Sequence, residues 1–230
     1  MKITNSIHIL LATSLLTVSS AFAEDYDLVI LNGRVMDPET LFDDIANVGI
    51  KDGRIVKITK EALKGAETLD ATGHIVGPGF IDTHFHWQAP LGYSIGLRDG
   101  LTSSMDLEIG CAGNFLDGWY KARAGKTQAN YGIASSHEQA RSMVIDGVVD
   151  DEIYERGPIA LLETRKKSGW SLQRPDLEQG NKILEIIDKG LQDGAIGIGS
   201  TLGYMRDGVS TREMFEVQKV AARYDRLTTA

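Results

Sequence analysis

Cysteine, proline and aromatic residues are scarce in this chain of 230 residues, which has one cysteine, five prolines and 7% aromatic residues. A single thiol excludes a disulfide within the chain and a zinc module built on several cysteines. Basic residues are also in deficit, with 24 Lys and Arg against 32 Asp and Glu and a net charge of −8. We therefore expect no nucleic-acid partner. The hydrophobic content of 42% is typical of a globular protein.

Long apolar runs are missing as well. The apolar segment from Ile7 to Val18 follows Lys2 and precedes the small residues that end at Ala23. It is too short for a spanning helix, which needs roughly 20 residues. The pattern predicts a signal peptide over residues 1–23, removal of that peptide after Ala23, and a secreted or periplasmic protein with no stable membrane span after cleavage.

Residues 24–73 show short strand-like runs separated by turn signals. Asn32-Gly33 and Asp52-Gly53 are residue pairs that favour tight hairpin turns. These signals predict a small antiparallel β unit, which we interpret as part of a β-sandwich domain.

From residue 74 onward, apolar runs alternate with helical periodicity. Asp176 is a predicted N-cap and Gln179 completes a capping-box pattern, while Ser210 opens a second helix. Residues 195–200 and 227–230 are predicted strands. Such alternation is typical of an α/β fold with a parallel sheet, either an open doubly wound sheet or part of a (β/α) barrel.

Two histidines follow the apolar run that begins at Pro78-Gly79. His84 and His86 are two residues apart, so in a strand their imidazoles would project to the same side as Asp82 and could converge on one metal ion. An isolated His-x-His motif also occurs by chance on polar surfaces. Here the motif ends a predicted buried strand, at the edge where α/β folds place their ligands.

The string DATGHIVGPGFIDTHFH, after a β unit that contains NGRVMDP and KDGRIVKI, resembles the amidohydrolase superfamily. The branch most similar to this sequence is that of the N-acyl-D-amino-acid deacylases (D-aminoacylases). Weaker matching strings are Asp99 to Glu108, Asn130-Tyr131-Gly132, His137, Gly194 to Gly199 and Gly203-Tyr204.

The resemblance implies a metal-dependent (β/α)8, TIM-like barrel, of which residues 74–230 would be a truncated N-terminal portion. It implies that His84 and His86 bind a divalent metal, for which zinc is the first expectation. The site would hold one or two ions. A further ligand would come from the second barrel strand, where we prefer Glu108 because it ends a predicted strand. Cys111 is the alternative, since thiolates bind zinc well.

Two further residues are candidate substrate contacts. Tyr204 follows a glycine-rich segment and could hydrogen-bond the substrate, or it could pack on a helix. His137 follows a predicted strand and could support the site or lie on the surface. We interpret the basic run Arg165-Lys166-Lys167 as a solvated face.

By this resemblance the activity is metal-assisted hydrolysis of a non-peptide C–N bond in a small-molecule amide, of the N-acyl-amino-acid deacylase type. Cyclic-amide hydrolysis, as in dihydroorotases and hydantoinases, is an alternative, and so is a non-catalytic remnant. The family's catalytic Asp and two further His ligands come from later strands, and we expect them beyond Ala230. Residues 74–230 are fewer than the roughly 250 of a full barrel, so we expect the chain to be a fragment. The sequence makes no prediction of oligomeric state.

Overall fold

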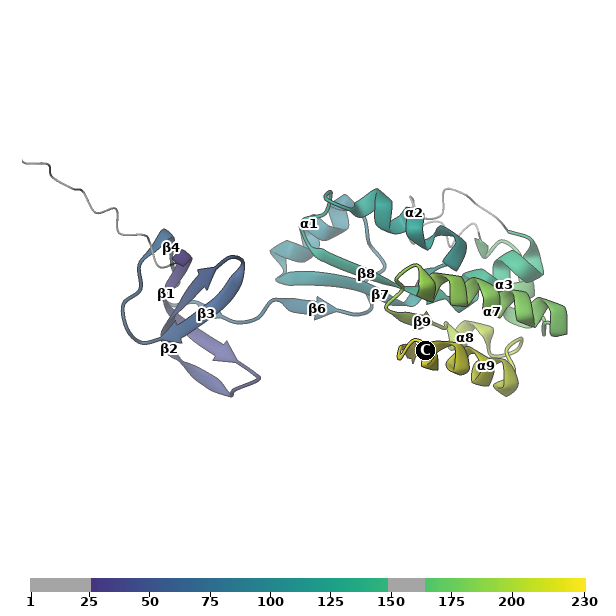
Figure 1. Cartoon of the computed structure of the whole chain (residues 1–230). Coiled ribbons are helices and arrows are strands. Elements are labelled where there is room, and N and C mark those ends of the chain that lie inside the picture. The colour runs from purple at the N-terminus through teal and green to yellow at the C-terminus, as the bar shows by residue number, and fades with distance from the viewer. Residues whose placement is uncertain (1–25, 149–163) are drawn as a thin grey trace, which may run out of the picture. The chain divides into compact units, whose positions relative to one another are not determined.

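The computed structural model describes residues 26–148 and 164–230, which form two compact units divided between Pro78 and Gly79 (Figure 1). This boundary lies five residues after the one expected from the turn pattern. The predicted signal peptide, residues 1–23, lies outside the described residues. Within the described ranges, no helix is both long enough and apolar enough to cross a bilayer.

The first unit is a five-stranded sheet in which β1, β2 and β3 pair antiparallel, as predicted. Two later strands extend it by pairing parallel to β1, an addition that the sequence pattern did not indicate. A small core fills the unit, with Val35, Ala46 and Val48 buried. The strands are β1 (Tyr26–Asp37), β2 (Phe42–Lys51), β3 (Arg54–Thr59), β4 (Gly65–Asp70) and β5 (Ile75–Val76).

The two predicted hairpin turns of this unit have different outcomes. Asp52 and Gly53 form the turn between β2 and β3, and both have a positive φ, at 50° and 69°. Asn32 and Gly33 do not form a turn, because they lie inside β1 at an irregularity in its pairing with β2. Asn32 still has a φ of 62°, and this positive φ is used in a β-bulge instead of a hairpin turn.

The second unit is a parallel sheet in the order β10-β9-β8-β7-β6, with helices between successive strands. This confirms the predicted α/β fold with a partial barrel. The strands are β6 (Phe80–Asp82), β7 (Leu101–Cys111), β8 (Asn130–Ser136), β9 (Gly197–Gly199) and β10 (Leu227–Thr229). The helices are α1 (Pro90–Arg98), α2 (Gly113–Arg123), α3 (His137–Asp146), α6 (Gly169–Leu172), α7 (Leu177–Gln192), α8 (Leu202–Met205) and α9 (Thr211–Ala222).

The main core lies between this sheet and the neighbouring helices α2, α7 and α9 (Figure 1). Its members from α7 recur at helical spacing and include the fully buried Ile183 and Ile187. A Cβ on Gly113 of α2 would come within 1.9 Å of the carbonyl oxygen of Ile186, so only glycine allows this approach of α2 to α7. The carboxyl ends of the parallel strands therefore meet at one edge of a well-packed unit.

Helix α7 begins with the predicted capping box. The Asp176 side chain accepts a hydrogen bond from the Gln179 backbone N–H at 2.8 Å, and the Gln179 side chain accepts one from the Asp176 N–H. We expect Asp176→Ala to lower the free energy of unfolding by about 1 kcal/mol, because the cap acceptor is lost. Urea denaturation measures the change. Asp176→Asn keeps an acceptor and is the matched control, and an equal loss in both variants would contradict the capping role.

Candidate metal centre

His84 and His86 lie in the segment just beyond β6. The sequence predicted that they end a buried strand, but β6 ends at Asp82 and its Phe80 and Ile81 are 67% and 65% exposed. These side chains are exposed because β6 pairs with β7 alone among the described strands. The segment nevertheless stays aligned with β7, since the Phe85 N–H donates to the Met105 carbonyl at 2.8 Å and the Leu107 N–H donates to the Thr83 carbonyl at 3.2 Å.

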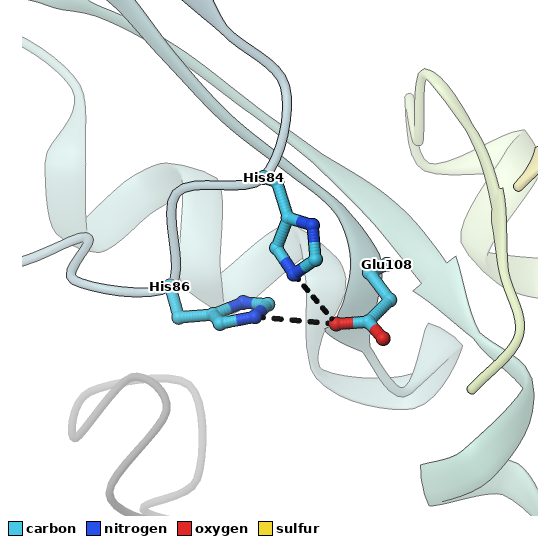
Figure 2. A group of neighbouring side chains, drawn as sticks. All are labelled: His84, His86 and Glu108. Carbon is cyan, nitrogen blue, oxygen red and sulfur yellow. Dashed lines mark ion pairs between the residues drawn. The ribbon is translucent and has the colours of Figure 1, made fainter. Parts of the chain in front are cut away.

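The two imidazoles converge on one carboxylate. Oε2 of Glu108 lies 2.9 Å from Nε2 of His84 and 3.2 Å from Nε2 of His86 (Figure 2). The ring centroids are 4.6 Å apart with planes inclined by 69°. The structure thus brings together the three residues for which the sequence predicted a shared metal ion.

A β-bulge near the end of β7 places Glu108 at this edge. The β7–β8 pairing is interrupted between Asp106 and Cys111, and Gly110 adopts a φ of 74°. A Cβ on Gly110 would come within 2.4 Å of the Ala134 carbonyl oxygen, so the position requires glycine. Bulges of this kind redirect the side chains of a strand.

The donor set fits a divalent metal. The ligand atoms of His84, His86 and Glu108 all lie within 4.8 Å of one another. Imidazole nitrogen and carboxylate oxygen bind zinc at about 2.0–2.2 Å, which puts neighbouring ligand atoms of a tetrahedral ion about 3.4 Å apart. A site with three protein ligands leaves one position of the ion open, as in catalytic zinc sites.

Asp106, a buried residue that the sequence analysis did not single out, lies behind His86. Its Oδ2 is 3.1 Å from Nδ1 of His86. This hydrogen bond is the main cause of a raised pKa of His86, although partial burial of the ring opposes it. The signal was present in the sequence, because Asp106 and Glu108 are two residues apart in a predicted strand.

Cys111, the alternative ligand, does not lie with the histidines. It is 2% exposed and belongs to the core between the sheet and the helices. Burial raises the pKa of its thiol to about 12, so the thiol stays protonated at neutral pH. The geometry therefore favours Glu108 over Cys111.

His137, predicted as a substrate contact or a surface residue, is fully buried. Its Nε2 lies 2.9 Å from Oε1 of Glu213 and its Nδ1 lies 3.1 Å from Oγ of Ser200. Because a carboxylate only accepts, Nε2–H donates to Glu213 and Nδ1 accepts from Ser200. Both ring nitrogens are thus occupied by protein groups, and the surface location is wrong.

Tyr204, the other predicted substrate contact, is 60% exposed in the short helix α8, which follows β9. The Arg165 guanidinium lies 4.7 Å from the centre of its ring. The prediction that Arg165 belongs to a solvated face is wrong, because its Nε and Nη2 donate to the buried carboxylate of Glu138 at 2.6 and 2.9 Å. Thr201 also donates to Glu138, so this fixed cation lies beside the tyrosine at the carboxyl end of β9.

The buried His137 predicts an acid-sensitive stability. Burial lowers the pKa of His137 below its ordinary value of 6.5, so the unfolded chain takes up a proton below that pH while the folded chain resists it. We therefore expect the free energy of unfolding to fall as the pH drops from 7.5 to 5.5, with a slope of at most about 1.4 kcal/mol per pH unit from this residue.

The control for this pH dependence is His137→Gln, measured by urea denaturation across the same range. Glutamine keeps a donor and an acceptor but does not titrate, so the fall should be shallower in the variant. The raised pKa of His86 changes the stability in the opposite direction with pH. His86 is present in both proteins, so its contribution cancels when the two slopes are compared. Equal slopes in the two proteins would contradict the assignment.

Comparison with known proteins finds similar sequences and folds among amidohydrolases. No family model matches the chain. A dihydroorotase of Streptococcus pneumoniae is 50% identical over 64 residues, which cover 27% of this chain and 15% of that protein. A D-aminoacylase structure superimposes with a TM-score of 0.68 at 20% identity, covering 87% of this chain and 44% of the other.

An N-acyl-D-glutamate deacylase of Bordetella bronchiseptica, solved with zinc and a phosphonate inhibitor, gives a TM-score of 0.65 at 21% identity. The match covers 89% of this chain and 44% of that enzyme. The chain thus spans less than half the length of these relatives. Together the matches confirm the resemblance to the amidohydrolase superfamily, with this chain corresponding to an N-terminal part of the amidohydrolase fold.

Proposed function

We propose that the protein is a metal-dependent amidohydrolase that removes the acyl group from N-acyl-D-amino acids. The observation that supports this most is the convergence of the His84 and His86 Nε2 atoms on one carboxylate oxygen of Glu108. The similar fold of two D-amino-acid deacylases favours this chemistry over other amide hydrolyses.

In this proposal His84, His86 and Glu108 hold the ion, with zinc as the expected metal. When bound, zinc supplies a Lewis acid that polarises an amide carbonyl and acidifies a water molecule. The histidines would bind through Nε2 as neutral ligands, and Glu108 is the negatively charged one. Its single charge offsets half of the charge of a divalent cation. The exposure of His84, whose side chain is 63% accessible, leaves the centre open to a substrate.

Tyr204 and Arg165 support a substrate with a carboxylate. The tyrosine is exposed, and the guanidinium beside it is held by Glu138 in a fixed position. Arg165 also lies near enough to Glu108 for their charges to interact. We propose that Tyr204 hydrogen-bonds the substrate and that Arg165 attracts its carboxylate, which an N-acyl-amino acid carries and a simple amide lacks.

Cyclic-amide hydrolysis is the second candidate function. It is favoured by two observations, the 50% identity to a dihydroorotase over 64 residues and the similar fold of an L-hydantoinase from Arthrobacter aurescens. The dihydroorotase match covers about a quarter of the chain, and the hydantoinase fold gives a TM-score of 0.57, below the 0.68 and 0.65 of the two deacylases.

Zinc binding tests the proposed centre. We expect the chain to bind zinc, and Glu108→Gln to weaken the affinity by more than about tenfold, because the variant loses the anionic member of the three assigned ligands. Competition with a chromophoric chelator measures the affinity. Cys111→Ala is the matched control and should leave the affinity unchanged, since the thiol lies in the core. Loss of zinc binding in the Cys111 variant alone would overturn the assignment of Glu108.

A substrate panel tests the activity. The protein expressed from its complete gene should hydrolyse N-acetyl-D-amino acids in a zinc-dependent reaction, and the 230-residue chain by itself should show little turnover because the site has three protein ligands and no assigned catalytic acid. Release of the free amino acid measures the rate. Dihydroorotate and hydantoins are the comparison substrates, and faster hydrolysis of these would establish the second candidate instead.

Cell fractionation combined with the activity assay tests where the protein is located. We propose export from the cytoplasm on the basis of the segment that ends at Ala23. Activity and protein should therefore appear in the periplasmic fraction with a mature chain that begins at Glu24. A cytoplasmic protein that retains residues 1–23 would contradict export.

A further inference from the structure

We propose that Asp106 is a positioning residue of the metal centre: it accepts a hydrogen bond from Nδ1–H of His86 and so leaves Nε2 of that ring unprotonated and directed at the ion. This inference rests on the proposed metal centre and assigns a role to a residue outside the ligand set.

Both carboxylate oxygens of Asp106 have fixed partners. The side chain is 5% exposed. Oδ1 accepts the backbone N–H groups of Ile109 and Gly110 at 3.0 and 3.2 Å, within the bulge that ends β7. Oδ2 is thereby directed to Nδ1 of His86, 3.1 Å away. The same bulge that places Glu108 thus also orients the carboxylate behind His86.

The tautomer of His86 follows from this arrangement. An ionised carboxylate only accepts hydrogen bonds, and a neutral imidazole has one N–H. Both ring nitrogens of His86 face a carboxylate, Nδ1 that of Asp106 at 3.1 Å and Nε2 that of Glu108 at 3.2 Å. With an ion between Nε2 and Glu108, Nε2 would bind through its lone pair, and the proton would reside on Nδ1, where Asp106 accepts it. Carboxylates commonly fix metal-binding histidines in this way.

His84 has no such support. Among the residues that the structure describes, no carboxylate contacts its Nδ1, and its side chain is 63% exposed. The two histidines of the motif therefore differ: the buried carboxylate of Asp106 holds the Nδ1 side of the His86 ring, while His84 contacts a carboxylate through Nε2 alone. We expect His86 to be the ligand that first engages the metal.

A competing explanation is that Asp106 only stabilises the bulge. The substitution Asp106→Asn separates the two roles, because the amide oxygen can still accept from Ile109 and Gly110. The amide NH₂ then faces His86 and donates to Nδ1, which forces the proton onto Nε2. The variant keeps the structural contacts and reverses the tautomer.

Nitrogen-15 NMR of the histidine-labelled full chain measures the tautomer directly, without metal and at a pH well above the pKa of histidine. Every sample carries Glu108→Ala, so that Nε2 of His86 faces no second carboxylate. We expect His86 to be protonated on Nδ1 when Asp106 is present and on Nε2 in Asp106→Asn. His84→Gln and His86→Gln assign the signals. A purely structural role of Asp106 would not change the tautomer, and the spectrum of the chain that keeps Asp106 is decisive even where the Asp106 variant fails to fold.

Zinc affinity gives the second readout. We expect Asp106→Asn to weaken binding by about 10- to 100-fold, and to have no further effect in a His86→Ala background, because Asp106 acts through His86. Asp117→Asn removes the same charge from an exposed ion pair on α2 and should leave the affinity unchanged.

The possible failures are distinguishable. With Glu108→Ala in both samples, an Nε2–H tautomer of His86 in the chain that keeps Asp106, or an unchanged tautomer in a folded Asp106→Asn variant, overturns the role of Asp106 while zinc binding can still support the proposed function. Absence of zinc binding by the unaltered chain overturns the metal centre itself, and with it the proposal that Nε2 is directed at an ion.

Discussion

The two backbone hydrogen bonds between β7 and the segment that follows β6 are the constraint on which the site depends. Strand β6 has only three residues, and the two hydrogen bonds that follow it hold the next segment against β7. Without this pairing, His84 and His86 would lie on an unconstrained loop. With it, both rings reach Glu108, and the bulge of β7 turns the carboxylate toward them.

Buried polar groups hold the same edge of the sheet together. Glu138 has no exposed surface and is neutralised by Arg165, while the buried Arg141 and His137 both contact Glu213. Burial of such charges is costly unless they are paired, so these contacts strongly favour one arrangement of the segments that follow β8 and β9. This part of the chain combines polar groups that stabilise the fold with Tyr204 at the surface.

Local sequence signals predicted the helix caps and turns that are formed by residues close together in the sequence. The capping box at Asp176, the cap at Ser210 and the turn at Asp52-Gly53 all formed as predicted. Asn32-Gly33 was predicted as a hairpin and is a bulge, because a positive φ satisfies either structure and the pairing with β2 continues past it. Cys111 and Glu108 were both plausible ligands, since a spacing of three residues does not show which side chain a bulge directs into the core.

The sequence by itself determined the alternation of strands and helices and the residue types of the candidate metal centre, because periodicity and the His-x-His spacing are local properties. It also indicated the resemblance to amidohydrolases. Only the tertiary structure decided that Asp106 stands behind His86, that Cys111 is buried in the core, and that Arg165 pairs with Glu138. These contacts join residues that lie on different elements, and their geometry follows from strand register and burial, which no single segment of the sequence specifies.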